Sequence, residues 1–126
     1  MIKYYHFVDE LVSEIMSMTD IPIEVGDRDN DPPTMILFPL DNVWWFFQMD
    51  DSFTEANMMF QLTCVGVSWQ QSVWLCEQAM DVILSIETEN IKRIRPHTTP
   101  QPQLDDAVTP PVWFAPTRWW ATVSYH

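Results

Sequence analysis

The chain has 126 residues, a length that fits one domain built around a single hydrophobic core. Hydrophobic residues make up 47% of the chain, which argues against a disordered protein. Its 18 acidic residues against 6 Lys and Arg give a formal net charge of -12, so tight binding of DNA or RNA by charge neutralisation is not expected.

The N-terminal segment has the pattern of an amphipathic helix. Apolar residues recur at helical spacing between Tyr4 and Ile15, with acidic residues beside them. A helix is predicted over Ile2–Met18, and it ends before Pro22, which disfavours helical backbone at the preceding residue. The acidic residues also make a signal peptide unexpected. The alternating residues Ile21–Val25 then predict a short strand.

Three aspartates at alternate positions, Asp27, Asp29 and Asp31, follow this strand in the stretch GDRDNDPPT. A calcium-binding EF-hand loop would continue with a glycine at its sixth position and a glutamate at its twelfth. Pro32 and Phe38 occupy these places, and no helix is predicted on either side. The stretch is therefore interpreted as a solvated loop between two strands that holds no metal, since Asp and Asn favour turns.

The runs TMILFPL and NVWWFFQM predict two strands, with residues 40–43 as a tight hairpin turn between them. Trp44 and Phe46 lie on one face of the second strand, and the apolar residues beside them lie on the other. Two helices can cover only one face of such a sheet, so these rings need another cover. Trp120, next to Trp119 in the last predicted strand, raises the same question. Two explanations remain open: burial on both sides within this domain, or burial against another copy or a partner.

A further strand and a second helix are predicted in the middle of the chain. The alternation in MMFQLTCVGVS places Phe60, Leu62 and Cys64 on one side of a strand. Ser68 and Gln71 have the spacing of a capping box, in which each side chain satisfies a backbone N–H at the start of a helix. Residues 56–76 carry no charge, but polar residues interrupt them, so no membrane span is predicted. An apolar stripe is expected along the helix: Trp69, Val73, Cys76, Met80, Ile83 and Leu84.

The last part of the chain begins with a predicted edge strand, IKRIR, whose Lys92, Arg93 and Arg95 carry half of the positive charge. These cations either keep the exposed edge from aggregating or meet acidic loops of a neighbouring subunit.

Five prolines argue against regular structure in residues 96–111, so a functional or mobile loop is predicted there. A final strand is expected to place four residues on one face: Trp119, Ala121, Val123 and Tyr125.

Motifs for catalysis or cofactor binding are not found in the sequence. It has no Gly-rich phosphate loop, no Gly-x-Ser-x-Gly and no His-Glu-x-x-His. His6, His97 and His126 lie near the termini or in the proline-rich segment and pair with nothing recognisable. Cys64 alternates inward, which is typical of core packing rather than of a nucleophile. The chain is therefore predicted not to be an enzyme and to need no cofactor.

The order of these elements predicts one α+β domain over residues 1–126, with a mixed, mainly antiparallel sheet and two helices packed on one face. The segment FQLTCVGVSWQQSVWLCEQAMDVIL combines a strand, a Val-Gly-x-Ser turn and a helix that opens with Gln and a Trp-Leu pair. This segment resembles the tail terminator proteins of long-tailed bacteriophages, also called tail completion or tail-to-head joining proteins. The N-terminal helix, the Asp/Pro-rich loop and the proline-containing segment before a closing aromatic strand fit the same layout.

The resemblance implies a subunit of a ring, typically of six copies, on the head-proximal end of the phage tail tube. Such a ring stops tube growth and joins the tube to the head connector, and DNA passes through its central channel without specific binding. The implied partners are copies of this chain, the tail tube protein and the head connector or completion protein, in a virion assembled in the host cytoplasm. The acidic loop of Asp27, Asp29 and Asp31 is expected at the surface or lumen of the ring. Candidate subunit contacts are Trp44, Phe46, Trp113, Trp120, Lys92, Arg93 and Arg95.

Two other functions remain open. A different neck or head-completion protein of the same virion would differ mainly in where it binds. An acidic mimic of DNA that inhibits a host nuclease would align its acids on one rigid element. Here the acids are spread over both predicted helices and several loops, which favours a structural protein.

Overall fold

Two helices and six strands make up the fold of the described residues. The computed structural model describes residues 4–26, 31–46, 55–97 and 101–124, and for residues 4, 5, 39–46, 55, 56 and 124 it describes the backbone alone. In chain order the elements are α1 (Tyr4–Met18), β1 (Ile23–Val25), β2 (Thr34–Phe46), β3 (Glu55–Gly66), α2 (Trp69–Ser85), β4 (Ile91–Pro96), β5 (Gln103–Asp105) and β6 (Val112–Ser124).

The strands form one sheet in the order β1-β2-β3-β6-β4, with β5 also paired to β6. The short β1 runs parallel to β2, and every other pair is antiparallel. One edge of the long β6 pairs with β3 along its length. On the other edge, β5 pairs with the first residues of β6 and β4 pairs with its last residues. The predicted mixed, mainly antiparallel sheet is confirmed, and so is the position of β4 at an edge.

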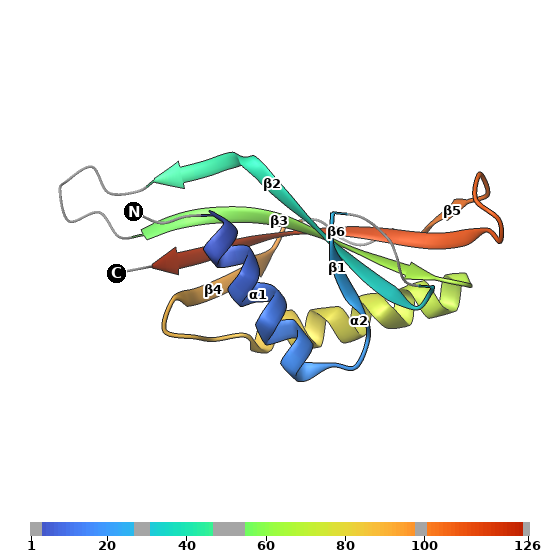
Figure 1. Ribbon diagram of the computed structural model, residues 1–126, viewed down its shortest axis with the longest axis horizontal. Helices are drawn as coiled ribbons and strands as arrows, with labels where there is room; N and C mark the ends of the chain where they lie inside the picture. Colours follow the sequence, from blue (N-terminus) through green and yellow to red (C-terminus); the bar gives the residue numbers. More distant parts are fainter. Residues whose placement is uncertain (1–3, 27–30, 47–54, 98–100, 125–126) are drawn as a thin grey trace.

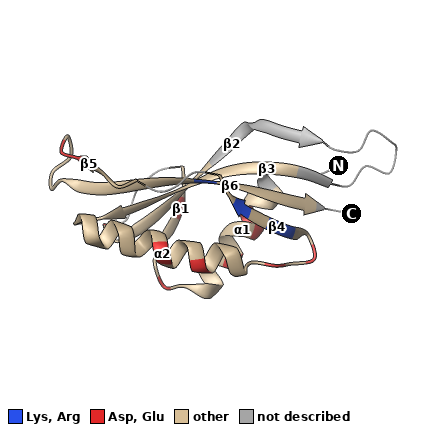
Figure 2. Ribbon diagram, turned by 180° about the vertical axis from the view of Figure 1, so that it is seen from behind, with Lys and Arg blue, Asp and Glu red and all other residues tan. Residues whose placement is uncertain are grey.

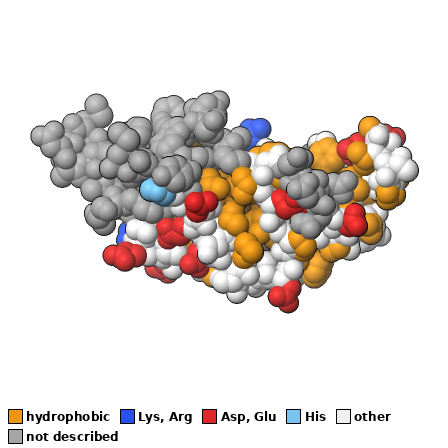
Figure 3. Space-filling model, viewed as in Figure 1, with side chains coloured by type: hydrophobic (Ala, Val, Ile, Leu, Met, Phe, Trp, Pro, Cys, Tyr) orange, Lys and Arg blue, Asp and Glu red, His pale blue; other side chains and the backbone are white. Residues whose placement is uncertain are grey.

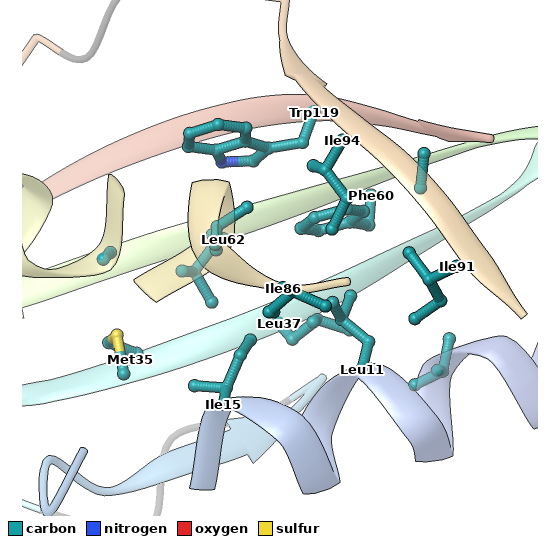
Figure 4. Packing of buried hydrophobic residues seen from close by; sticks show 14 of the residues in the cluster. Leu11, Ile15, Met35, Leu37, Phe60, Leu62, Ile86, Ile91, Ile94 and Trp119 are labelled. Carbon is teal, nitrogen blue, oxygen red and sulfur yellow. The ribbon is translucent and has the colours of Figure 1, made fainter. Parts of the chain in front are cut away.

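Both helices pack on the same face of the sheet, as seen from either side (Figures 1 and 2). The apolar residues of α1 recur every four positions, so they lie on one face of the helix and point at the strands. Figure 4 shows Leu11 and Ile15 of α1 beneath Leu37, Phe60 and Trp119 of the sheet. The predicted α+β layout with two helices on one face is therefore confirmed. The core cluster from the helices comprises Phe7, Val8, Leu11, Ile15, Leu75, Cys76, Ala79 and Ile83.

The hairpin turn predicted at residues 40–43 is wrong. The chain continues as the single strand β2, which pairs with β3 on both sides of an irregularity. Pro39 stands opposite Phe60 and Trp44 stands opposite Met58, so the four residues between Pro39 and Trp44 bulge out of the ladder. Pro39 has no N–H to donate, and prolines inside sheets are found at such bulges. Residues 40–43 therefore form a bulge within one strand and not a turn between two.

The apolar stripe predicted along α2 is also partly wrong. Trp69 and Leu84 are exposed, and Val73 and Met80 are only half-buried. The side that faces the sheet carries Leu75 and Ile83 together with the smaller residues Ser72, Cys76 and Ala79.

The first turn of α2 lies very close to the sheet, and this limits which side chains can face the sheet there. A methyl group added at Gly66 would lie 2.7 Å from the backbone nitrogen of Ser72, so α2 begins almost in contact with the end of β3. The Ser72 hydroxyl donates to the Cys64 carbonyl at 3.4 Å across the same contact. At this contact only a small side chain, such as that of Ser72, fits between the two backbones.

Regular structure is present within the proline-rich segment, contrary to the prediction for residues 96–111. Strand β5 pairs with β6, and Gln103 stands opposite Phe114 in this pairing. Prolines flank β5 at residues 102 and 110 but do not interrupt it, so its three residues keep the N–H groups that a ladder requires.

Candidate interaction surface

The face of the sheet opposite the helices, here called the open face, is only partly covered by the residues that the structure describes. Alternation along β6 places Ala115, Thr117 and Trp119 on the side of the helices, and Pro116 and Arg118 between them on the open face. Ile36, Val65 and Val112 are buried there as a second, small apolar cluster. The partly buried residues that pack against this cluster are Phe38, Val108 and Phe114.

The open face contains a hollow of about 360 Å³ beside this second cluster. Six apolar residues of β2, β3 and β6 line this open-face hollow: Ile36, Phe38, Val65, Val112, Phe114 and Pro116. Its polar lining consists of Gln61, Thr63 and Asp105. The Gln61 amide donates to the Thr63 hydroxyl at 3.2 Å, and the Asp105 carboxylate accepts from the Ala107 amide at 3.1 Å. These polar groups are engaged locally, so the hollow suits an apolar side chain.

A group of cations lies next to the hollow along the same face. All Lys and Arg side chains of the described residues belong to β4 and β6: Lys92, Arg93, Arg95 and Arg118. We call these residues the cationic strip, and Figure 2 shows Lys and Arg on these two strands. Arg93 stands opposite Thr122 and Arg95 opposite Trp120 in the pairing of β4 with β6. All members of the strip are exposed.

Trp120 contacts His97, a residue for which no partner was predicted from the sequence. Its indole N–H donates to Nδ1 of His97 at 3.3 Å, and the two rings meet edge to face with centroids 6.0 Å apart. The His97 backbone N–H donates to the Arg118 carbonyl at 2.8 Å, which holds His97 in place just beyond β4. Trp120 is half-buried, and because it alternates with the buried Trp119 it lies on the open face and not under the helices. Only the pairing of β4 with β6 brings His97 and Trp120 together.

The other candidate contact residues do not all lie on the open face. Trp113 is half-buried, and because it alternates with Val112 and Phe114 it lies on the helix side of the sheet. The side chains of Trp44 and Phe46 lie outside the described part of the chain. Among the candidate contacts, the open face therefore brings together Trp120 and the cations of β4.

The acidic stretch between β1 and β2 is described in part. Asp31 is exposed, whereas Asp27 and Asp29 lie outside the described residues. Gly26, directly before them, has a φ of 81°, a left-handed conformation that suits glycine, and its N–H donates to the Leu37 carbonyl at 2.9 Å. No three His, Cys, Asp or Glu side chains within the described ranges lie close enough together to hold a metal ion.

The candidate nucleophile Cys64 is part of the core. It is fully buried in β3, and its thiol interacts with that of Cys76 on α2. The hydrogen bond with Cys76 raises the pKa of Cys64 well above its usual value, and burial raises it further. Cys64 is therefore a protonated thiol at neutral pH, and its interpretation as core packing is confirmed.

Comparison with models of known protein families found no match, and comparison with curated protein sequences found none either. Neither helix of the described part of the chain is long and apolar enough to span a membrane. A function therefore has to follow from the residues and their arrangement. The open face is the feature that most needs an explanation, because it combines an apolar hollow with the cations of a strongly acidic chain.

Proposed function

We propose that the chain is a structural subunit that assembles with copies of itself into a ring, and that the ring caps the head-proximal end of a phage tail tube as a tail terminator does. The observation that carries this proposal is the open face of the sheet, with its hollow of about 360 Å³ and its row of cations. Apolar hollows next to charged residues on an otherwise polar protein mark sites of protein–protein contact.

The charge of the open face favours a head-to-tail contact. Two open faces meeting about a two-fold axis would place cationic strips against each other, and like charges would oppose the contact. Contact with a different, acidic surface of the next copy avoids this repulsion. Head-to-tail contacts of this kind generate closed rings when the rotation between subunits closes, and open filaments when it does not.

The charge of the whole chain fits a channel for DNA. A ring of subunits with a formal charge of -12 each repels phosphate, so DNA can slide through it without being held. In this proposal the ring has six copies, contacts the tail tube protein on one side and the head connector on the other, and belongs to the neck of the virion. It catalyses no reaction.

Light scattering of the purified chain over a range of concentrations, followed by negative-stain imaging, tests the proposal. We expect closed rings with a central opening, either for the chain alone or after it meets tail tubes of its phage. Addition to free tail tubes and to filled heads distinguishes a terminator, which binds tubes first, from a head-completion protein. A chain that stays monomeric with and without tail tubes would contradict the proposal.

A further inference from the structure

We infer that the outward face of α2 is the surface that docks on the open face of the next copy, with Trp74 in the hollow and the acids of α2 on the cationic strip. This inference rests on the proposed ring and specifies its subunit contact. The outward face of α2 is defined here by Trp74, Glu77, Asp81 and Leu84.

The outward face of α2 combines large apolar side chains with negative charge. Trp74 and Leu84 are 47% and 53% exposed, and Glu77 and Asp81 between them are exposed as well. The four residues follow one another at steps of three or four, so they form one stripe opposite the side that packs on the sheet. α2 carries no Lys or Arg. Figure 3 shows hydrophobic and acidic side chains side by side at the surface where α2 lies in Figure 1.

Exposed tryptophan is costly for a monomer and useful at an interface. A Trp side chain buries about 150–250 Å² when it is covered, and Trp and Arg are the residues most often found at energetically dominant contact points. The open-face hollow is lined by Phe38, Phe114 and Pro116 among other apolar residues, and its volume of about 360 Å³ leaves room for one large ring. Trp74 therefore has a matching site on another copy.

The spacing of charges on the two surfaces agrees with this arrangement. Along α2, Asp81 lies about 10 Å from Trp74, at a rise of about 1.5 Å per residue. Along β6, Arg118 lies about 13 Å from Phe114 at the wall of the hollow, at about 3.3 Å per residue. With Trp74 in the hollow, Asp81 thus reaches the region of Arg118, and Arg95, opposite Trp120 and so two residues further along β6, is the next cation. Arg93, opposite Thr122, lies further from the hollow.

A second copy of the chain is the occupant that these observations favour. The partner must be acidic and must present a large exposed apolar side chain, and α2 has both properties. The helices and the open face also lie on opposite sides of the sheet (Figure 1), so one subunit can contact a neighbour on each side. This is the geometry that a head-to-tail ring requires.

Two charge-reversal variants test the inference. Variant A is Arg95→Glu with Arg118→Glu, and variant B is Glu77→Lys with Asp81→Lys; all four side chains are exposed. Each variant alone places like charges on both surfaces of every junction, and we expect its self-association to weaken by at least about a hundredfold. An equal mixture of A and B restores opposite charges at every junction, so assembly should return to the extent seen for the unchanged chain.

The matched control is Asp9→Lys with Asp20→Lys, which changes the net charge as variant B does but lies outside α2. This control should assemble as the unchanged chain does. For the apolar contact, Trp74→Ser should weaken assembly by more than Trp69→Ser does, while the two substitutions lower the free energy of unfolding by similar amounts because both rings are about half-buried in the subunit. Trp69→Ser is its control, because Trp69 is 49% exposed but lies off the stripe of Trp74.

The outcomes separate this inference from the proposed function. If the unchanged chain forms rings and variants A and B form them equally well, the contact is elsewhere and the inference is overturned, while the ring stands. If association is lost in A and B and returns in the mixture, but only open chains form, the inference holds and the ring fails. A chain that is monomeric under all conditions overturns both.

Discussion

The hydroxyl group of Thr117 connects two buried groups, the indole of Trp119 in the same strand and the backbone carbonyl of Leu62 in β3. Its oxygen accepts a hydrogen bond from the indole N–H of Trp119 at 2.9 Å and donates to the Leu62 carbonyl at 2.8 Å. Thr117→Val keeps the shape of the side chain but leaves the buried N–H and carbonyl without this partner. We expect the free energy of unfolding, measured by urea denaturation, to fall by about 1–3 kcal/mol.

The control for this prediction is Thr122→Val in the same strand. The Thr122 hydroxyl donates to the Asn57 side chain at 2.8 Å, but this pair is half-buried, and water can replace the lost bond. Its effect should be smaller than that of Thr117→Val. If both substitutions lowered the free energy of unfolding equally, the buried hydrogen bonds of Thr117 would stabilise the fold no more than the half-buried bond of Thr122.

At the scale of elements, the start of α2 depends on two reciprocal hydrogen bonds. The Ser68 hydroxyl accepts from the Gln71 backbone N–H at 3.1 Å, and the Gln71 side chain accepts from the Val67 N–H at 2.8 Å. The predicted capping box is thus present, although Gln71 reaches one residue further back than expected. Ser68→Ala should lower the free energy of unfolding by about 1 kcal/mol, because one N–H at the helix start loses its acceptor.

Ser85→Ala at the other end of α2 is the matched control. The Ser85 hydroxyl is exposed and donates to the Val82 carbonyl at 2.7 Å within the same helix, so its loss should change the free energy of unfolding by less than about 0.5 kcal/mol. Thermal or urea unfolding of both variants measures the difference. A loss at Ser85 as large as that at Ser68 would contradict the assigned role of the cap.

At the scale of the whole molecule, the two faces of the sheet should respond differently to the loss of an aromatic ring. Phe60 is fully buried under the helices, with its ring centroid 5.9 Å from that of Phe7. Phe60→Ala should cost about 3–5 kcal/mol in the free energy of unfolding. Phe114 on the open face is only half-buried in the isolated subunit, so Phe114→Ala should cost less stability and should weaken assembly instead.

Urea denaturation at low protein concentration measures the first quantity, and light scattering at high concentration measures the second. The result expected for Phe114→Ala is a folded chain that assembles poorly. If this variant loses as much stability as Phe60→Ala and assembly is unaffected, the open face is part of the core of the subunit and not a contact surface.

Local patterns were sufficient to predict most elements. The four-residue repeat of Phe7, Leu11 and Ile15 and the two-residue alternation of Phe60, Leu62 and Cys64 predict a helix and a strand, and both elements and their buried faces are found. The sequence also predicted the cap of α2 and the edge position of β4. These features depend on neighbours within a few residues, which is why the sequence alone determined them.

Features that depend on distant parts of the chain were decided by the tertiary structure. The long β3 pairs with both halves of β2, so a predicted turn became a bulge. α2 begins in close contact with Gly66, and the side chains that it turns to the sheet are not those of the predicted stripe, since Trp69 and Leu84 are exposed. The hollow and the cationic strip share one face only because β2, β3, β4 and β6 align in a particular register. Backbone pairing and close packing join residues far apart in sequence, and spacing along the chain carries no record of these partners.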